Sequence, residues 1–280
     1  MTLLGAAQIR ELAAQLDLKP SKSLGQNFVI DSNVCSKIVR TAGVTPDDIA
    51  LEIGPGLGSL TLAILDIAKE VIAVEIDSRL AEQLPITVAQ YFDHPENLTV
   101  LNQDALKISE LPGQPTVLVA NLPYNVSVPV LLHLLERFPT IRSGVVMVQA
   151  EVADRLAAKP GGKEYGLPSV KAACWADVKN VGTVSRSIFW PAPNVDSKLV
   201  GFTRRPTPGD DEMRVKVFTI IDNAFAQRRK MLRSALSGLY GSSAAAEQIL
   251  IKAGIDPTLR GEALEIEGFC KIAAVAPDIF

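Results

Sequence analysis

Residues 51–59 read Leu-Glu-Ile-Gly-Pro-Gly-Leu-Gly-Ser and continue an apolar run that begins at Ile49. The run predicts a buried strand over 49–53, and the segment 59–68 predicts a helix. Closely spaced glycines between a strand and a helix let the backbone approach a ligand through turns that are closed to other residues. The stretch therefore indicates an α/β fold with a ligand loop at the end of its first predicted strand.

Short apolar segments and helical segments continue to alternate after this stretch, which is typical of a parallel sheet with helices on both faces. The predicted strands are 71–76, 98–101, 116–120 and 145–149, and the predicted helices are 79–89 and 128–137. Ahead of the sheet we expect a helix at 3–16. A second helix should begin after Asp31, a good N-cap residue, and end at Gly43.

The composition changes at residues 206–211, Pro-Thr-Pro-Gly-Asp-Asp, which is a linker pattern. Helical periodicity then continues to the end of the chain, with predicted helices at 212–224, 227–236, 244–253 and 263–274. We therefore predict two domains. An α/β domain covers 1–206, with a leader of residues 1–18, and a small all-helical domain covers 207–280.

The composition argues against several classes of protein. Hydrophobic residues make up 48% of the 280 residues, yet no apolar run approaches the ~18 residues that a membrane helix needs. Cys35, Cys174 and Cys270 are far apart, which is typical of reduced thiols in a cytoplasmic protein and unlike a zinc site. His94 and His133 are the only histidines. We therefore expect chemistry without histidine, without a metal and away from membranes.

Polar residues follow the predicted strands where each strand ends. Glu75 lies at the end of the second strand, and Asp104 lies just past the third. Open α/β sheets bind ligands at the carboxyl ends of their strands, where a carboxylate accepts hydrogen bonds from ribose hydroxyls. A dinucleotide-binding enzyme would carry a third glycine where Ser59 stands. Glu52, two residues ahead of the glycines, and Gly58 fit S-adenosylmethionine better.

The fourth predicted strand ends in Asn121-Leu122-Pro123-Tyr124. Pro123 ends the strand because it has no N–H for the ladder, so an amide and an aromatic ring stand on a stiffened turn. The amide offers an acceptor and two donors, and the ring offers a flat face, which together suit a planar heterocycle with an exocyclic amine. A proline-terminated strand with ordinary turn residues explains the same four residues, and the motif alone does not decide between the two.

Several motifs resemble those of the rRNA adenine N6-dimethyltransferases, and the resemblance extends over nearly the whole chain. Two of these motifs are the most specific: Asn-Leu-Pro-Tyr-Asn, which starts at Asn121, and Phe-x-Pro-x-Pro-x-Val-Asp-Ser at 189–197. Trp190 departs from the family pattern, in which this position is often small or polar. The other matching segments are Lys22 to Phe28, Glu52 to Gly58, Glu75 to Asp77, Gln103 to Ala105 and Phe225 to Lys230.

This resemblance implies a Rossmann-like methyltransferase sheet and S-adenosyl-L-methionine as the cofactor. Asn27 and Val29 would contact its methionine end, Glu75 its ribose and Asp104 its adenine amine. The implied cofactor residues are Asn27, Val29, Gly54, Glu75, Ile76, Asp104, Ala105 and Asn121.

The resemblance also implies a catalytic set that consists of Asn121, Leu122, Pro123, Tyr124 and Phe189. The side-chain oxygen of Asn121 and the carbonyl of Leu122 would accept the two protons of the target amine. Tyr124 and Phe189 would sandwich the target adenine after it has left the base stack.

A basic run opens the predicted helical domain, although the net charge of the chain is −3. Nucleic-acid binding depends on local patches, so the overall charge does not exclude it. Arg228, Arg229, Lys230 and Arg233 form the run, in which Arg229 and Arg233 are spaced to share a helix face. A solvated basic helix face is the commoner explanation of such a run. With the family motifs beside it, we predict an RNA-binding patch, which Lys19, Lys22, Lys198, Arg204 and Arg205 could extend.

The resemblance is strongest to bacterial enzymes that dimethylate N6 of two adjacent adenosines near the 3′ end of 16S rRNA. The expected partner is thus 16S rRNA within the 30S subunit or its precursor, in ribosome biogenesis, and we expect a cytoplasmic monomer. The nearest alternative is a related enzyme that methylates 23S rRNA, against which Asn125 and the segment 227–230 argue. An RNA-binding assembly factor without catalysis would not need Glu75 or Asn121, and a nicotinamide-dependent dehydrogenase would need a hydride-transfer pair that the sequence lacks.

Overall fold

The computed structural model describes residues 3–19 and 26–277, and these residues form two compact units. The first unit contains the residues up to 153 together with 179–204, and the second contains 154–178 together with the residues from 205 onward. The second unit is therefore larger than the segment that follows the linker at 206–211. The assignment of separate functions to 1–206 and 207–280 stays a prediction.

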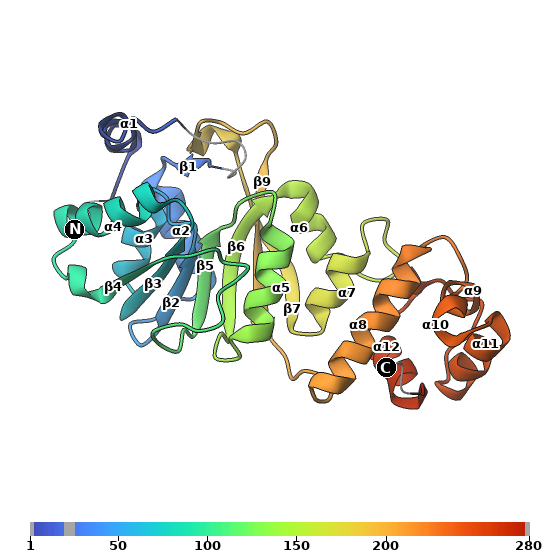
Figure 1. The fold of residues 1–280 in the computed structure, drawn as a ribbon. Helices are drawn as coiled ribbons and strands as arrows, with labels where there is room; N and C mark the ends of the chain where they lie inside the picture. Colours follow the sequence, from blue (N-terminus) through green and yellow to red (C-terminus); the bar gives the residue numbers. More distant parts are fainter. Residues whose placement is uncertain (1–2, 20–25, 278–280) are drawn as a thin grey trace. The chain divides into compact units, whose positions relative to one another are not determined.

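A mostly parallel sheet is the centre of the first unit (Figure 1). Within the described residues its seven strands have the order β4-β3-β2-β5-β6-β9-β7. The strands β4, β3, β2, β5 and β6 pair in parallel, and β9 runs antiparallel to β6. Their bounds are β2 Ile49–Ile53, β3 Glu70–Glu75, β4 Leu98–Asn102, β5 Val117–Asn121, β6 Ser143–Gln149, β7 Ala176–Val184 and β9 Ser197–Arg204.

The strands at the middle of this sheet are buried along nearly their whole length, as the apolar runs predict. Helices flank the sheet, so the predicted α/β class is confirmed (Figure 1). In the first unit they are α1 Ala6–Gln15, α2 Ser32–Ala42, α3 Ser59–Leu65, α4 Ser78–Tyr91, the 3₁₀ turn η1 Pro95–Asn97, α5 Ser127–Arg137 and the 3₁₀ turn η2 Arg186–Ile188; α6 Ala150–Leu156 continues into the second unit. None of the helices in the described residues is long and apolar enough to span a bilayer.

The helix α2 has the two ends that the sequence predicts. Asp31 Oδ1 accepts hydrogen bonds from the backbone N–H groups of Asn33 at 2.9 Å and Val34 at 3.2 Å, so its side chain caps the first turn. Gly43 ends the helix in the left-handed region, with φ of +67°.

A second, two-stranded sheet joins segments that are far apart in the sequence. The strand β1 (Phe28–Val29) pairs antiparallel with β8 (Phe189–Trp190), with Phe28 opposite Trp190 and Val29 opposite Phe189. The rings of Phe28 and Trp190 stack with their centroids 6.2 Å apart and their planes at 25°. Trp190, the departure from the family pattern, therefore packs on the segment that precedes α2.

The second unit is largely helical, but the predicted helix at 227–236 is wrong. The helix α8 (Asp211–Ala226) ends at Ala226, a turn follows, and α9 (Leu232–Ala235) is a single short turn. Backbone pairing with a distant segment interrupts the helix, because Leu232 N–H donates to Leu259 O at 2.7 Å and Met231 bridges Arg260. The remaining elements are α7 Leu167–Ala173, α10 Ser237–Tyr240, α11 Ser243–Lys252, the 3₁₀ turn η3 Gly261–Ala263 and α12 Ile266–Val275.

Candidate functional site

A cavity lies in the first unit at the carboxyl ends of β2, β3 and β5. The structure brings all of the predicted cofactor residues to its lining, although they come from separate segments of the chain. Pro123 and Glu52 line the same cavity. The predicted residues in the lining are Asn27, Val29, Gly54, Glu75, Ile76, Asp104, Ala105 and Asn121. Their individual roles toward a cofactor stay predictions.

The glycine loop between β2 and α3 requires glycine in this conformation. Gly54, Gly56 and Gly58 have φ of +67°, +58° and +96°, in the left-handed region that other residues avoid. A Cβ on Gly56 would lie 2.9 Å from Cδ1 of Phe28, closer than real Cβ contacts allow. The loop thus passes directly under the Phe28 ring, and its backbone forms part of the cavity wall.

Glu75, at the end of β3, is held in place by backbone groups. Its Oε1 accepts the N–H of Asp77 at 3.0 Å, and its Oε2 accepts the N–H of Gly56 at 3.2 Å. The side chain is buried, and burial raises the pKa of Glu75 above its ordinary value, against the lowering effect of the two backbone bonds. The two backbone bonds therefore hold the carboxyl group of Glu75 in a fixed orientation at the cavity.

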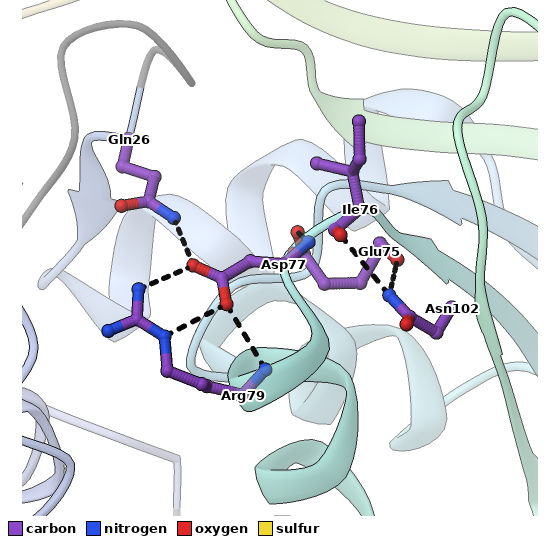
Figure 2. A network of polar contacts seen from close by, with 6 residues as sticks. All are labelled: Gln26, Glu75, Ile76, Asp77, Arg79 and Asn102. Carbon is purple, nitrogen blue, oxygen red and sulfur yellow. Dashed lines mark hydrogen bonds and ion pairs between the residues drawn. The ribbon is translucent and has the colours of Figure 1, made fainter.

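The loop after β3 is fixed by Asn102, which ends the neighbouring strand β4. The Asn102 Nδ2 donates to Glu75 O at 2.8 Å and to Ile76 O at 3.2 Å (Figure 2). This leaves the apolar Ile76 side chain 53% exposed on the cavity, and Asp104 also lines it. An exposed apolar side chain and a carboxylate suit the face and the amine edge of an adenine ring.

An acidic clamp ties the segment before β1 to the same loop (Figure 2). Asp77 Oδ2 accepts from Gln26 Nε2 at 3.1 Å and from Arg79 Nη2 at 2.9 Å, while Oδ1 accepts from Arg79 Nε at 3.2 Å. The bonds from Arg79 and Gln26 lower the pKa of Asp77 despite its partial burial. Sequence reasoning missed this clamp because Gln26 and Asp77 are distant in the chain; the only sign was that each belongs to a matching motif.

Asn121 presents an acceptor that has no partner among the described residues. Its Nδ2 donates to Asn27 O at 3.1 Å, which fixes the orientation of the amide. Its Oδ1 is buried and accepts no hydrogen bond from any described residue. Buried polar atoms are nearly always paired, so an orphaned oxygen at a cavity is suited to a donor brought by a ligand.

The other predicted catalytic residues are placed differently from one another. Leu122 is buried and donates its N–H to Met147 O at 3.1 Å. Tyr124 is half-buried, and its hydroxyl lies 2.7 Å from Ser197 Oγ, while burial raises the pKa of the phenol. Phe189 is only 3% exposed, so stacking on its ring requires that its face be uncovered. The sandwich of Tyr124 and Phe189 around a base stays a prediction.

Glu52 is a further titratable group at the cavity. It is buried, and its Oε2 has no hydrogen-bond partner among the described residues. Burial raises the pKa of Glu52 to about 8, and the negative charge of Glu75 acts in the same direction. Burial therefore favours the protonated form of this carboxyl group. The sequence indicated Glu52 only as part of the glycine motif.

The basic run of the second unit is partly committed to internal pairs. Arg228 Nε lies 2.8 Å from Glu262 Oε2, and Arg233 Nη1 lies 3.4 Å from Glu247. Arg229 and Lys230 are exposed in the turn after α8 and line a surface hollow with Arg228. Because α8 ends at Ala226, the expectation that Arg229 and Arg233 share a helix face is wrong.

Two of the candidates to extend this run have structural partners. Arg204 donates from Nε to Ile141 O at 2.7 Å and from Nη2 to Leu135 O at 2.8 Å, so it caps backbone carbonyls of the first unit. Arg205 is ion-paired with Glu267. Lys22 and the start of its motif, residues 22–25, lie outside the described residues.

Comparisons with known proteins show which family the chain belongs to. The sequence profile of the ribosomal RNA adenine dimethylase family matches residues 18–277. A relative from Leifsonia xyli subsp. xyli, "Ribosomal RNA small subunit methyltransferase A", is 58% identical over 98% of this chain and 99% of its own length. The protein of the same name from Streptomyces griseus subsp. griseus is also 58% identical, over 99% of this chain and 96% of its own.

Two solved structures are similar over most of the chain. A dimethyladenosine transferase from Plasmodium falciparum has a TM-score of 0.73 at 25% identity, covering 88% of this chain and 95% of its own. The 23S rRNA methyltransferase ErmE has a TM-score of 0.66 at 26% identity, and the match covers 89% of this chain and 98% of that one. The chain belongs to the ribosomal RNA adenine dimethylase family.

Proposed function

We propose that this member of the ribosomal RNA adenine dimethylase family dimethylates N6 of two adjacent adenosines near the 3′ end of 16S rRNA, with S-adenosyl-L-methionine as methyl donor. The substrate is the 30S subunit or its precursor, and the enzyme acts in ribosome biogenesis as a cytoplasmic monomer. The observation that carries the proposal is the orphaned Oδ1 of Asn121 at a cavity that is lined by all the predicted cofactor residues. The 58% identity to relatives named as small-subunit enzymes, against 26% to the 23S enzyme, favours the small-subunit substrate.

The cavity fits the cofactor by the chemistry of its lining. Glu75 offers fixed acceptors for ribose hydroxyls, and Ile76 and Asp104 offer an apolar face and an acceptor for adenine. Gly56 leaves space beneath the Phe28 ring that any Cβ would fill. When bound, the cofactor supplies an electrophilic methyl group on a sulfonium. The clamp from Asp77 to Gln26 would keep Asn27 at the methionine end of the cavity.

The residues at the end of β5 then have to orient a poor nucleophile. The lone pair of the adenine amine is delocalised into the ring, so the amine reacts only after it is reoriented. Hydrogen bonds from its two N–H groups to Asn121 Oδ1 and to the Leu122 carbonyl favour a pyramidal nitrogen with its lone pair directed at the methyl group. Asn121 is ready for this because Asn27 already fixes its amide. Catalysis here is mostly positioning and electrostatic preorganisation.

The target base must leave the base stack before it can reach the residues at the end of β5. Splayed bases of RNA stack on aromatic side chains, and the half-buried Tyr124 directly follows Pro123 of the cavity wall. Such stacking contributes about 1–3 kcal/mol per base. Arg229 and Lys230, which are exposed in the second unit, would bind backbone phosphates and contribute affinity that falls with salt.

Two measurements test the proposal. Calorimetry with S-adenosylmethionine separates a methyltransferase from a dehydrogenase, which would not bind the cofactor. Incubation with labelled cofactor and under-methylated small subunits, followed by primer extension, then maps the modified nucleotides. We expect two adjacent stops near the 3′ end of 16S rRNA. Cofactor binding without any methyl transfer would instead indicate an assembly factor that has kept the fold.

A further inference from the structure

We infer that Ser197 is a positioning residue for the methyl transfer, because its hydroxyl holds the phenol of Tyr124 and thereby the ring on which the target purine stacks. The inference rests on the proposed function. Its basis is the 2.7 Å hydrogen bond between Tyr124 Oη and Ser197 Oγ. This bond connects the two most specific motifs of the sequence, one after β5 and the other ending at the start of β9.

The two partners of this bond differ in how firmly they are held. Ser197 is fully buried, at 0% exposed, and stands opposite Gln149 in the antiparallel pair of β6 and β9. The residue before it is fixed too, since Ala150 N–H donates to Asp196 O at 2.9 Å. Tyr124 lies instead in the turn between β5 and α5 and is half-buried. Ser197 thus connects the rigid sheet to the side chain of a turn residue.

The geometry of a phenol allows this bond to fix the orientation of the Tyr124 ring. The phenolic oxygen is conjugated with the ring, so its O–H and lone pairs lie in the ring plane, and a partner favours that plane whichever atom donates. The backbone of the turn fixes one end of the Tyr124 side chain, and Ser197 fixes the other. Both torsions of the side chain are then restrained before a base arrives. A preorganised ring avoids the cost of ordering it during binding.

A bond that served only the fold would behave differently. Its loss would lower the free energy of unfolding and leave the kcat of the folded enzyme unchanged. A positioning bond instead acts on the reacting geometry, so its loss lowers kcat while cofactor binding stays the same. Neither Tyr124 nor Ser197 is among the described residues that line the cofactor cavity, which makes this separation measurable.

The test is a double-mutant cycle in the full-length enzyme with Ser197→Ala, Tyr124→Phe and the combined variant. Each single change deletes the same bond from opposite ends and keeps the ring. Rates are measured on under-methylated small subunits, the affinity for S-adenosylmethionine by calorimetry, and stability by denaturant unfolding. Thr41→Ala is the control, because it removes the exposed hydroxyl that donates to Lys37 O at 2.8 Å on α2.

We expect each single variant to lose about threefold to tenfold in kcat, as for one neutral hydrogen bond, and the double variant to lose no more than the worse single one. The affinity for the cofactor should not change, and Thr41→Ala should match the wild type. Wild-type kcat in Ser197→Ala, or multiplicative losses in the double variant, would overturn the inference while the proposed function stands. A wild-type protein that transfers no methyl group would overturn the proposed function itself.

Discussion

Replacement of Asn121 by Ala should separate catalysis from stability. The change removes the Nδ2 bond to Asn27 O and also removes the orphaned Oδ1. Loss of the bond costs about 0.5–1.5 kcal/mol, and removal of a buried unpaired acceptor relieves about 1–3 kcal/mol. The free energy of unfolding should therefore change by between a loss of about 0.5 and a gain of about 2.5 kcal/mol.

The effect on the reaction should be much larger than the effect on stability. Removal of one preorganised hydrogen-bonding group from an active site typically lowers kcat by about 10²- to 10³-fold. The assay is methyl transfer to under-methylated small subunits at saturating cofactor, with denaturant unfolding of the same samples. A loss of several kcal/mol in stability, or a kcat within a few-fold of the wild type, would refute the role of Asn121 as an amine acceptor.

Asn102 provides the matched control for this prediction. Like Asn121, it ends a strand of the parallel sheet, but its Nδ2 donates two hydrogen bonds, to Glu75 O and Ile76 O. Asn102→Ala should thus lose about 1–3 kcal/mol of stability. Because it fixes the loop that carries the cofactor residues, it should weaken cofactor binding without the selective loss in kcat.

Three further predictions concern the cavity and the second unit. Gly56→Ala should lose about 1–2 kcal/mol of unfolding free energy because of its left-handed backbone, and more because of the contact with Phe28. Gly43→Ala, which has open space around its Cβ, should show the backbone cost alone. Unfolding experiments measure both. Glu52, whose pKa burial raises to about 8, holds a proton in the folded state that the unfolded chain has released, so stability is lost as the pH rises from the ordinary pKa of 4.5 toward 8. Glu52→Gln should remove that loss, so the stability of the variant relative to the wild type should increase as the pH rises over this range. A difference in unfolding free energy between the two proteins that does not change with pH would contradict the prediction. Arg229→Glu should raise the KM for small subunits and flatten its salt dependence with kcat unchanged.

The sequence predicted the parts of the fold that local patterns determine. The cap at Asp31, the stop at Gly43 and the buried strands all follow from nearby residues, and the structure agrees with them. The carboxyl ends of parallel strands meet at one edge of a sheet, so Glu75 and Asn121 could be assigned to one site before any coordinates were known.

Long-range pairing explains what the sequence did not show. The break between α8 and α9 depends on the bond from Leu232 N–H to Leu259 O, whose partners no local pattern connects. Phe189, which the family resemblance places in the sandwich around the target base, likewise lies in the pair of β1 and β8 and is 3% exposed. The bond from Tyr124 to Ser197 joins two motifs whose bonded residues are 73 positions apart in the chain.

The most direct test of the central claim is mass spectrometry of the 3′-terminal fragment of 16S rRNA, after under-methylated small subunits have been treated with the enzyme and S-adenosylmethionine. We predict two neighbouring N6,N6-dimethyladenosines in the treated particles and none after treatment with Asn121→Ala for the same short time. Unmodified adenosines after treatment with the wild-type enzyme, or methyl transfer only to 23S rRNA when large subunits are treated in parallel, would contradict the account.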